Sequence, residues 1–139
     1  WNKPLLAIST LQMMAQGMKS TLNEADAWYC PMLDARRQEV FTAIYDAKLA
    51  PVMEPQAMIL EAGSFDTFLA QEKIVFFGNG SPKWAQLLPS NDNAVFKQYE
   101  MNAADMGPLA EQLYHQKSFA DLAYFSPFYL KGFYFPQKP

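Results

Sequence analysis

The chain has 139 residues, of which half are hydrophobic and 18% are charged, a composition typical of one globular domain and not of a disordered segment. Its formal net charge is −3 and its pI is about 5.0, whereas a dedicated nucleic-acid-binding protein usually carries a basic surplus. No apolar stretch reaches the ~18 residues of a membrane span and no signal-peptide pattern opens the chain, so the sequence predicts a cytoplasmic protein without membrane contact.

The first part of the chain predicts a helix over roughly residues 10 to 20. Ser9 or Thr10 can serve as its N-cap, and apolar residues, several of them methionine, follow at helical spacing. The chain opens on Trp1 and an apolar segment, from which we expect a processed or truncated chain, the later part of a larger protein.

Two aromatic and β-branched runs, 27–33 and 39–46, predict strands joined as an antiparallel hairpin. Both runs are apolar on both faces, which favours a central position in a sheet covered on each side. Pro31 argues against this position for the first run, because proline removes a ladder donor and prefers an edge strand or a bulge. A weaker third strand, interrupted by two prolines, is predicted over 51–60.

The second half of the chain alternates between helix and strand signals. We expect a short helix capped by Ser64, a strand at 73–77, a Gly-rich turn, a helix capped by Ser81 and a strand at 94–99. A last helix is expected to begin near Asn102, which can form a capping box with Asp105, or to begin at Asp105 itself. This order predicts a mixed α/β (α+β) fold, with a mixed sheet flanked by helices.

Few residues suit catalysis or metal binding. Cys30 is the only cysteine, which excludes an intrachain disulfide, and its apolar surroundings predict a buried side chain in a reducing compartment. His115 is the only histidine, which excludes a histidine-based metal cluster, and it is expected near a helix C-terminus. The spacing of the carboxylates indicates no acid–base pair. The sequence therefore predicts no catalytic residue and no metal site.

The stretch "FFGNGSPKW" reads as a strand, a Gly-rich turn and a helix N-terminus. Such a geometry can bind a phosphate through backbone amides, which makes Gly78, Asn79 and Gly80 candidate cofactor-binding residues. The stretch lacks the complete dinucleotide fingerprint and the lysine–hydroxyl pair of a P-loop, so a plain strand-to-helix turn is the simpler interpretation.

The polar centre of the predicted hairpin is the sharpest polar feature. Arg36 and Arg37 are adjacent there, between Asp34 and Glu39. They can solvate the turn, pair with these carboxylates, or contact a partner or an adjoining domain. Further along the chain, seven aromatic residues lie between 124 and 135, a segment that either packs back on the sheet or docks on another surface.

Four stretches occur in the order found in the TsaB (YeaZ-like) family, the glycoprotease-like subunit of tRNA threonylcarbamoyladenosine synthesis. The stretch "MLDARRQEVFTAIYD" resembles the family's DAR-x-x-E-V-Y hairpin, and "KPLLAISTLQMMA" its pl-x-ai-s-T-L segment. The stretch "VFFGNGSPKW" is similar to its G-x-G turn, and "SPFYLKGF" to its terminal P-x-Y-l-R element, with Lys131 where arginine is usual.

The resemblance implies an actin-like ATPase, RNase H-like lobe: one domain over 1–139 that corresponds to the second, C-terminal lobe of a two-lobe protein whose first lobe is absent. It implies a non-catalytic scaffold subunit that supports a TsaD-type enzyme in threonylcarbamoyl modification of tRNA adenosine, with no peptidase activity. A TsaE-type ATPase joins that complex, tRNA is contacted indirectly, and ATP or ADP is expected only in the full complex. Residues expected at a partner or interdomain surface are Asp34, Arg36, Arg37, Glu39, Tyr129 and Lys131.

Two other functions stay open from the sequence. One is an enzyme with a nucleotide-binding lobe that uses residues 78–80, and the other is a stand-alone interaction module that uses the aromatic tail. The oligomeric state, including a homodimer, is also open.

Overall fold

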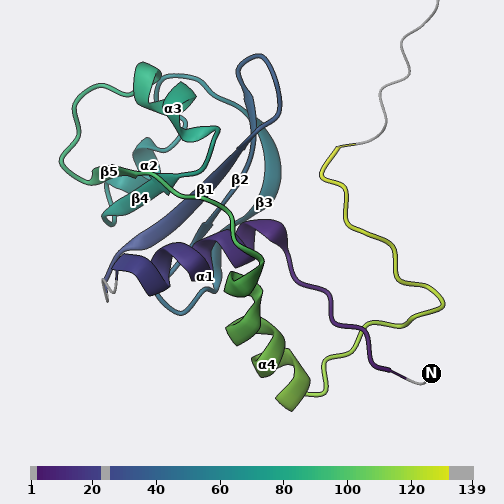
Figure 1. Ribbon diagram of the computed structural model, residues 1–139. Coiled ribbons are helices and arrows are strands. Elements are labelled where there is room, and N and C mark those ends of the chain that lie inside the picture. Colours follow the sequence, from purple (N-terminus) through teal and green to yellow (C-terminus); the bar gives the residue numbers. More distant parts are fainter. Residues whose placement is uncertain (1–2, 23–25, 132–139) are drawn as a thin grey trace, which may run out of the picture.

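The computed structural model describes residues 3–22 and 26–131, and a five-stranded mixed sheet forms its centre (Figure 1). The strands are β1 (Trp28–Asp34), β2 (Glu39–Tyr45), β3 (Pro51–Ile59), β4 (Ile74–Phe77) and β5 (Ala94–Lys97). Their order in the sheet is β3-β2-β1-β4-β5. The pairs β1–β2 and β2–β3 are antiparallel, whereas β1–β4 and β4–β5 are parallel. The predicted hairpin and the predicted mixed sheet are therefore confirmed.

Helices cover both faces of the sheet. They are α1 (Thr10–Leu22), α2 (Asp66–Leu69), α3 (Ser81–Leu87), the 3-10 helix η1 (Ala103–Met106) and α4 (Gly107–His115). Helices α1 and α4 lie on one face, and α2 and α3 lie on the other (Figure 1). This two-sided cover explains why the strands at the centre of the sheet are apolar on both faces.

Strand β4 shows most directly how the sheet divides the core into two layers. All four of its residues are buried, and they alternate between the layers because successive side chains of a strand point to opposite faces. Val75 and Phe77 pack with α1 and α4, whereas Ile74 and Phe76 pack with α2 and α3. The methionine stripe of α1 belongs to the first layer, as its spacing predicts.

Pro31 lies in the central strand, so the inference that it marks an edge or a bulge was wrong. It pairs in register with Phe77 of β4, and its carbonyl accepts a hydrogen bond of 2.8 Å from the Thr42 hydroxyl of β2. Proline lacks only the amide donor, and the strong burial of β1 on both faces outweighs the loss of one ladder bond.

Two helix starts differ from their predicted caps. Ser81 is the first residue of α3 and Gly80 is the N-cap, because the Ser81 hydroxyl donates to the Gly78 carbonyl (2.8 Å) and does not cap an amide. The short helix α2 follows Phe65 with no side-chain cap, whereas Ser64 accepts a bond from the Glu61 amide at 2.9 Å.

Asn102 does cap a helix, but in a simpler arrangement than a capping box. Its side chain accepts a bond of 2.9 Å from the Ala104 amide and starts η1, after which α4 begins at Gly107. The Asp105 carboxylate instead accepts a 2.5 Å hydrogen bond from the Tyr99 hydroxyl. The Tyr99 hydroxyl, which lies before the helix, thus replaces the expected capping partner.

The C-terminal segment, residues 116–131, returns beside the N-terminal segment, and the two meet at an isolated antiparallel bridge between Leu5 and Ala120 (Figure 1). The aromatic side chains of this segment are largely exposed, at 87% for Tyr124 and 82% for Phe128. The aromatics predicted at 133–135 lie outside the described residues. Within 3–22 and 26–131, the helices are too short or too polar to cross a bilayer.

Candidate functional site

The turn between β1 and β2 projects from the end of the sheet and carries both arginines (Figure 1). The Glu39 amide donates to the Arg36 carbonyl and the Ala35 amide donates to the Glu39 carbonyl, each at 3.1 Å. Arg36 and Arg37 have φ angles of 70° and 50°. This left-handed region is unfavourable for residues with a β-carbon, so the fold holds two arginines in a strained turn.

Asp34 connects this turn to α3. Its Oδ1 accepts hydrogen bonds from the Arg36 amide at 2.7 Å and from the Lys83 ammonium at 2.6 Å, and its own amide donates to the Asn79 side chain at 2.9 Å. The bond from Lys83, followed by that from the Arg36 amide, lowers the pKa of the Asp34 carboxyl below its usual value. The carboxylate therefore fixes the base of the turn while it is ionised.

Glu39, at the other side of the turn, connects it to the C-terminal segment. The Lys131 ammonium donates to Glu39 Oε2 at 2.6 Å. The Lys83 ammonium also lies 3.3 Å from the Glu39 carbonyl oxygen. Each carboxylate of the turn thus has a lysine partner that comes from another element.

The side chains of Arg36 and Arg37 are exposed. Among the described residues, neither guanidinium has an ion pair or a hydrogen bond. The sequence leaves open that the arginines pair with Asp34 or Glu39. The structure does not show this pairing, because Lys83 and Lys131 bind the two carboxylates.

The turn at Gly78, Asn79 and Gly80 lies at the same end of the sheet, because β4 runs parallel to β1. A β-carbon at Gly78, whose φ is 92°, would collide with the Met32 carbonyl oxygen, and one at Gly80 would lie 2.9 Å from Val40 Cγ1. The glycines allow this turn to pack directly against β1.

Two backbone amides of this turn already have partners inside the protein. The Gly80 amide donates to the Met32 carbonyl at 3.0 Å, and the Ser81 amide donates to the Gly78 carbonyl at 3.1 Å. A phosphate cradle needs such amides free and pointing outward. The geometry therefore gives the turn a packing role, and nucleotide binding by residues 78–80 stays a prediction.

Tyr129 and Lys131 both line an apolar cavity of about 670 Å³ between the N-terminal segment and the C-terminal segment. Leu6, Ile8, Leu33 and Phe41 supply part of its wall. Tyr129 thus lies beside the apolar cavity, whereas Lys131 borders both the cavity and the arginine turn. The two residues that sequence reasoning groups thus share the cavity, and Lys131 alone also reaches the arginine turn.

Two residues of the site escaped sequence reasoning. Lys83 neutralises Asp34, and Ile59 lies opposite Glu39 in the register of β3 and β2. Sequence reasoning did not consider Lys83, although it lies in the stretch "FFGNGSPKW", and nothing local connects Ile59 to the turn. Among residues 3–22 and 26–131, no three histidine, cysteine or acidic side chains are placed to hold a metal ion.

No family model and no curated protein matches the chain by sequence. Solved structures do match by fold. Over 93% of its length the chain is similar to an uncharacterized protein with similarity to peptidase YeaZ from Pseudomonas aeruginosa, with a TM-score of 0.76 and 20% identity. Over 92% of its length it is similar to YeaZ from Pseudomonas aeruginosa, with a TM-score of 0.69 and 18% identity.

The chain spans 60% of the length of each of these structures. At such identities the likeness establishes the shared fold. The expected actin-like, RNase H-like architecture, a mixed sheet flanked by helices, is confirmed, and the chain is YeaZ-like in structure.

Proposed function

We propose that the chain forms the second lobe of a TsaB-type scaffold subunit, which supports a TsaD-type enzyme in threonylcarbamoyl modification of tRNA adenosine. The observation that carries the proposal is the YeaZ-like fold over 93% of the chain, with the four resembling stretches in the family's order. A TsaE-type ATPase is the further partner, and tRNA is contacted through the complex. The proposal places the chain in the cytoplasm.

The chemistry of the chain supports a scaffold more than an enzyme. Its one cysteine, Cys30, is completely buried between two packed layers, and burial raises the pKa of its thiol to about 12. A nucleophilic cysteine needs the opposite, an exposed thiolate of lowered pKa. His115 is exposed at the end of α4, with Glu111 at 3.8 Å as its charged neighbour. Neither residue has the setting of a catalytic nucleophile or base.

The proposal is tested on the parent protein in its own cell. The protein is depleted, total tRNA is digested, and threonylcarbamoyladenosine is quantified by mass spectrometry. We expect the modified nucleoside to fall strongly and to recover when the full-length protein is restored. Depletion of an unrelated protein of similar abundance controls for slowed growth.

An unchanged level of the nucleoside would overturn the scaffold function. The nucleotide-binding lobe would then be tested by calorimetric titration of the chain with ATP and ADP. The interaction module would be tested by deletion of residues 124–139, which removes the exposed aromatics Tyr124 and Phe128.

A further inference from the structure

We propose that the arginine turn and the adjoining end of β3 form a docking surface for an acidic protein segment that also presents an apolar side chain. We call this surface the hairpin groove. It is a hollow of about 650 Å³ lined by residues 35–39, Ile59 and Lys131. The proposal is independent of the function proposed above, because it follows from the charges and exposure of these residues alone.

The charges of the hairpin groove leave a local positive surplus. Asp34 is neutralised by Lys83 and Glu39 by Lys131, each at 2.6 Å. Among the described residues, the guanidiniums of Arg36 and Arg37 are therefore two unpaired positive charges at this end of the sheet. Glu61, which follows a residue bonded to the Gln38 carbonyl, offsets only one of them, in a chain whose net charge is −3. A carboxylate ligand would complete the charge balance, and arginine pairs with carboxylates through two parallel hydrogen bonds.

The turn is held in position before any partner arrives. Asp34 and Glu39 anchor its two sides to α3 and to the C-terminal segment, and the Asp34 amide is held by Asn79. Two consecutive arginines in the left-handed region strain the backbone, and an asparagine followed by a glycine would adopt these φ angles with less strain. Backbone strain of this kind concentrates where function requires it.

The exposed apolar side chain of Ile59 favours a protein over a nucleic acid as the ligand of the hairpin groove. Ile59 is 66% exposed and lies opposite Glu39 in the sheet, within the lining of the hairpin groove. Arginine beside an apolar contact is typical of protein interfaces. A nucleic-acid backbone would gain nothing from Ile59, and the acidic surface of the chain would repel it over longer distances.

The test is an NMR titration of the ¹⁵N-labelled chain with the capped peptide Glu-Leu-Glu-Leu-Glu. Its matched control is the same peptide with glutamine at each glutamate, and hexauridylate is the nucleic-acid probe. We expect saturable shift changes centred on the amides of residues 35–39 and 59 and near Lys131, with the glutamine peptide at least about tenfold weaker, as charge-assisted pairing requires.

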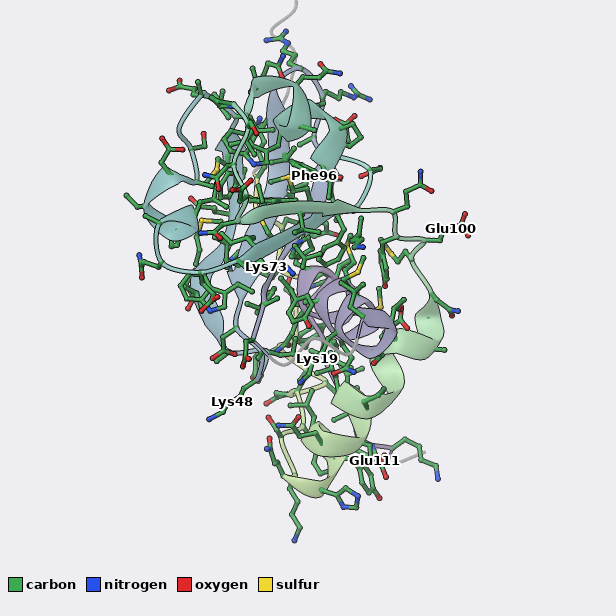
Figure 2. The ribbon with its side chains drawn as sticks, turned by 90° about the vertical axis from the view of Figure 1, so that its left-hand side faces the viewer. Lys19, Lys48, Lys73, Phe96, Glu100 and Glu111 are labelled. Carbon is green, nitrogen blue, oxygen red and sulfur yellow. The ribbon has the colours of Figure 1, made fainter. Side chains whose placement is uncertain are left out.

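Three variants locate the binding energy. Arg36→Asn/Arg37→Gly removes both charges but supplies residues that suit the left-handed turn, so it is expected to fold and to bind the acidic peptide about tenfold more weakly. Ile59→Ser should weaken binding of the acidic peptide and leave binding of hexauridylate unchanged. Lys48→Gln/Lys97→Gln removes the same charge from exposed positions outside the groove and should bind like the wild type. Lys48 lies in the connection from β2 to β3, at the opposite end of these strands from the β1–β2 turn, and Figure 2 shows it on the outside of the molecule.

Equal binding of both peptides, shift changes scattered over the chain, or unchanged affinity of the Arg36→Asn/Arg37→Gly variant would overturn the proposal. Stronger shifts at the same residues with hexauridylate than with the acidic peptide would also overturn it and would assign the groove to nucleic acid.

Discussion

Lys131 and Glu39 are separated by 92 residues in the sequence, yet the lysine ammonium lies 2.6 Å from the glutamate carboxylate. The C-terminal segment meets the N-terminal segment at Ala120 and then runs to the arginine turn. The ion pair holds the end of this segment at the turn. The pair thus joins the last described residues of the chain to the turn at the end of the central strands.

The first prediction concerns this ion pair. Lys131 is 56% exposed, so its loss should change global stability by less than about 1 kcal/mol. Its local effect should be larger, because the pair anchors the end of a segment whose aromatic side chains are largely exposed. We expect Lys131→Met to speed amide hydrogen exchange in residues 119–131, and Lys131→Arg to preserve the wild-type rates. Equal exchange in all three proteins would contradict this role.

The pH dependence of stability should report on Asp34. Its folded-state pKa is lowered by Lys83 and by the Arg36 amide, so the ionised carboxylate stabilises the fold above the unfolded-state pKa of about 3.9. That contribution is lost as pH falls toward the folded-state pKa.

We therefore expect Asp34→Asn to be less stable than the wild type at pH 7, with the difference shrinking below about pH 4. Urea unfolding across this range measures it. Asp92→Asn, at an exposed loop position, is the matched control and should track the wild type throughout. A difference for Asp34→Asn that does not shrink as the pH falls below about 4 would point to a cause other than ionisation.

Two glycines offer a matched pair. An alanine at Gly78 would be strained at φ 92° and would collide with the Met32 carbonyl, so Gly78→Ala should destabilise the chain by about 2 kcal/mol or more. Nothing lies within 4 Å of a β-carbon at Gly107, which has helical φ and ψ, so Gly107→Ala should be neutral or mildly stabilising. Thermal melts compare the two, and similar melting temperatures would refute the packing role of Gly78.

Cys30 provides a test of the core. Burial raises the pKa of its thiol to about 12, and its sulfur lies 3.3 Å from the Thr42 hydroxyl. We expect the native chain to resist a disulfide reagent such as Ellman's reagent, and the thiol to react at the rate of a free cysteine in 6 M guanidinium. Rapid reaction in native buffer would show that the two layers around β1 open easily.

Trp84 carries an unusual buried group. It is fully buried, and its indole nitrogen has no hydrogen-bond partner among the described residues. Trp84→Ala should cost about 3–5 kcal/mol through the cavity that it leaves. Trp84→Phe should cost much less, because it keeps the ring contacts with Phe65 and Phe76 and removes an unpaired donor. Chemical denaturation would separate the two, and equal losses would contradict this account.

Local sequence patterns were sufficient for the main elements of the fold. The run "KIVFF" and the two runs that flank the arginine turn are apolar and rich in β-branched and aromatic residues, and each forms a strand close to its predicted bounds. The methionine stripe after Thr10 likewise forms the buried face of α1. These predictions succeed because hydrophobic periodicity is a property of neighbouring residues.

Predictions failed where burial, or a side chain outside the predicted element, competes with a local rule. Pro31 lies in the centre of the sheet because burial on both faces outweighs one missing donor, and Asp105 leaves the expected capping box for the Tyr99 hydroxyl. The candidate site likewise combines residues that local patterns reveal with partners that only the structure reveals. Its residues 34–39 could be found in the sequence, whereas the lysines that neutralise Asp34 and Glu39 come from α3 and from the C-terminal segment.

The sequence by itself determined the strands, the hairpin and the presence of two adjacent arginines in its turn, since each depends on residues within a few positions of one another. Only the tertiary structure decided which charges in that turn remain unpaired. It brought Lys83 and Lys131 to the two carboxylates and Ile59 to the side of Glu39. Such pairings depend on strand order and on the path of the returning chain, which long-range packing sets and no local pattern records.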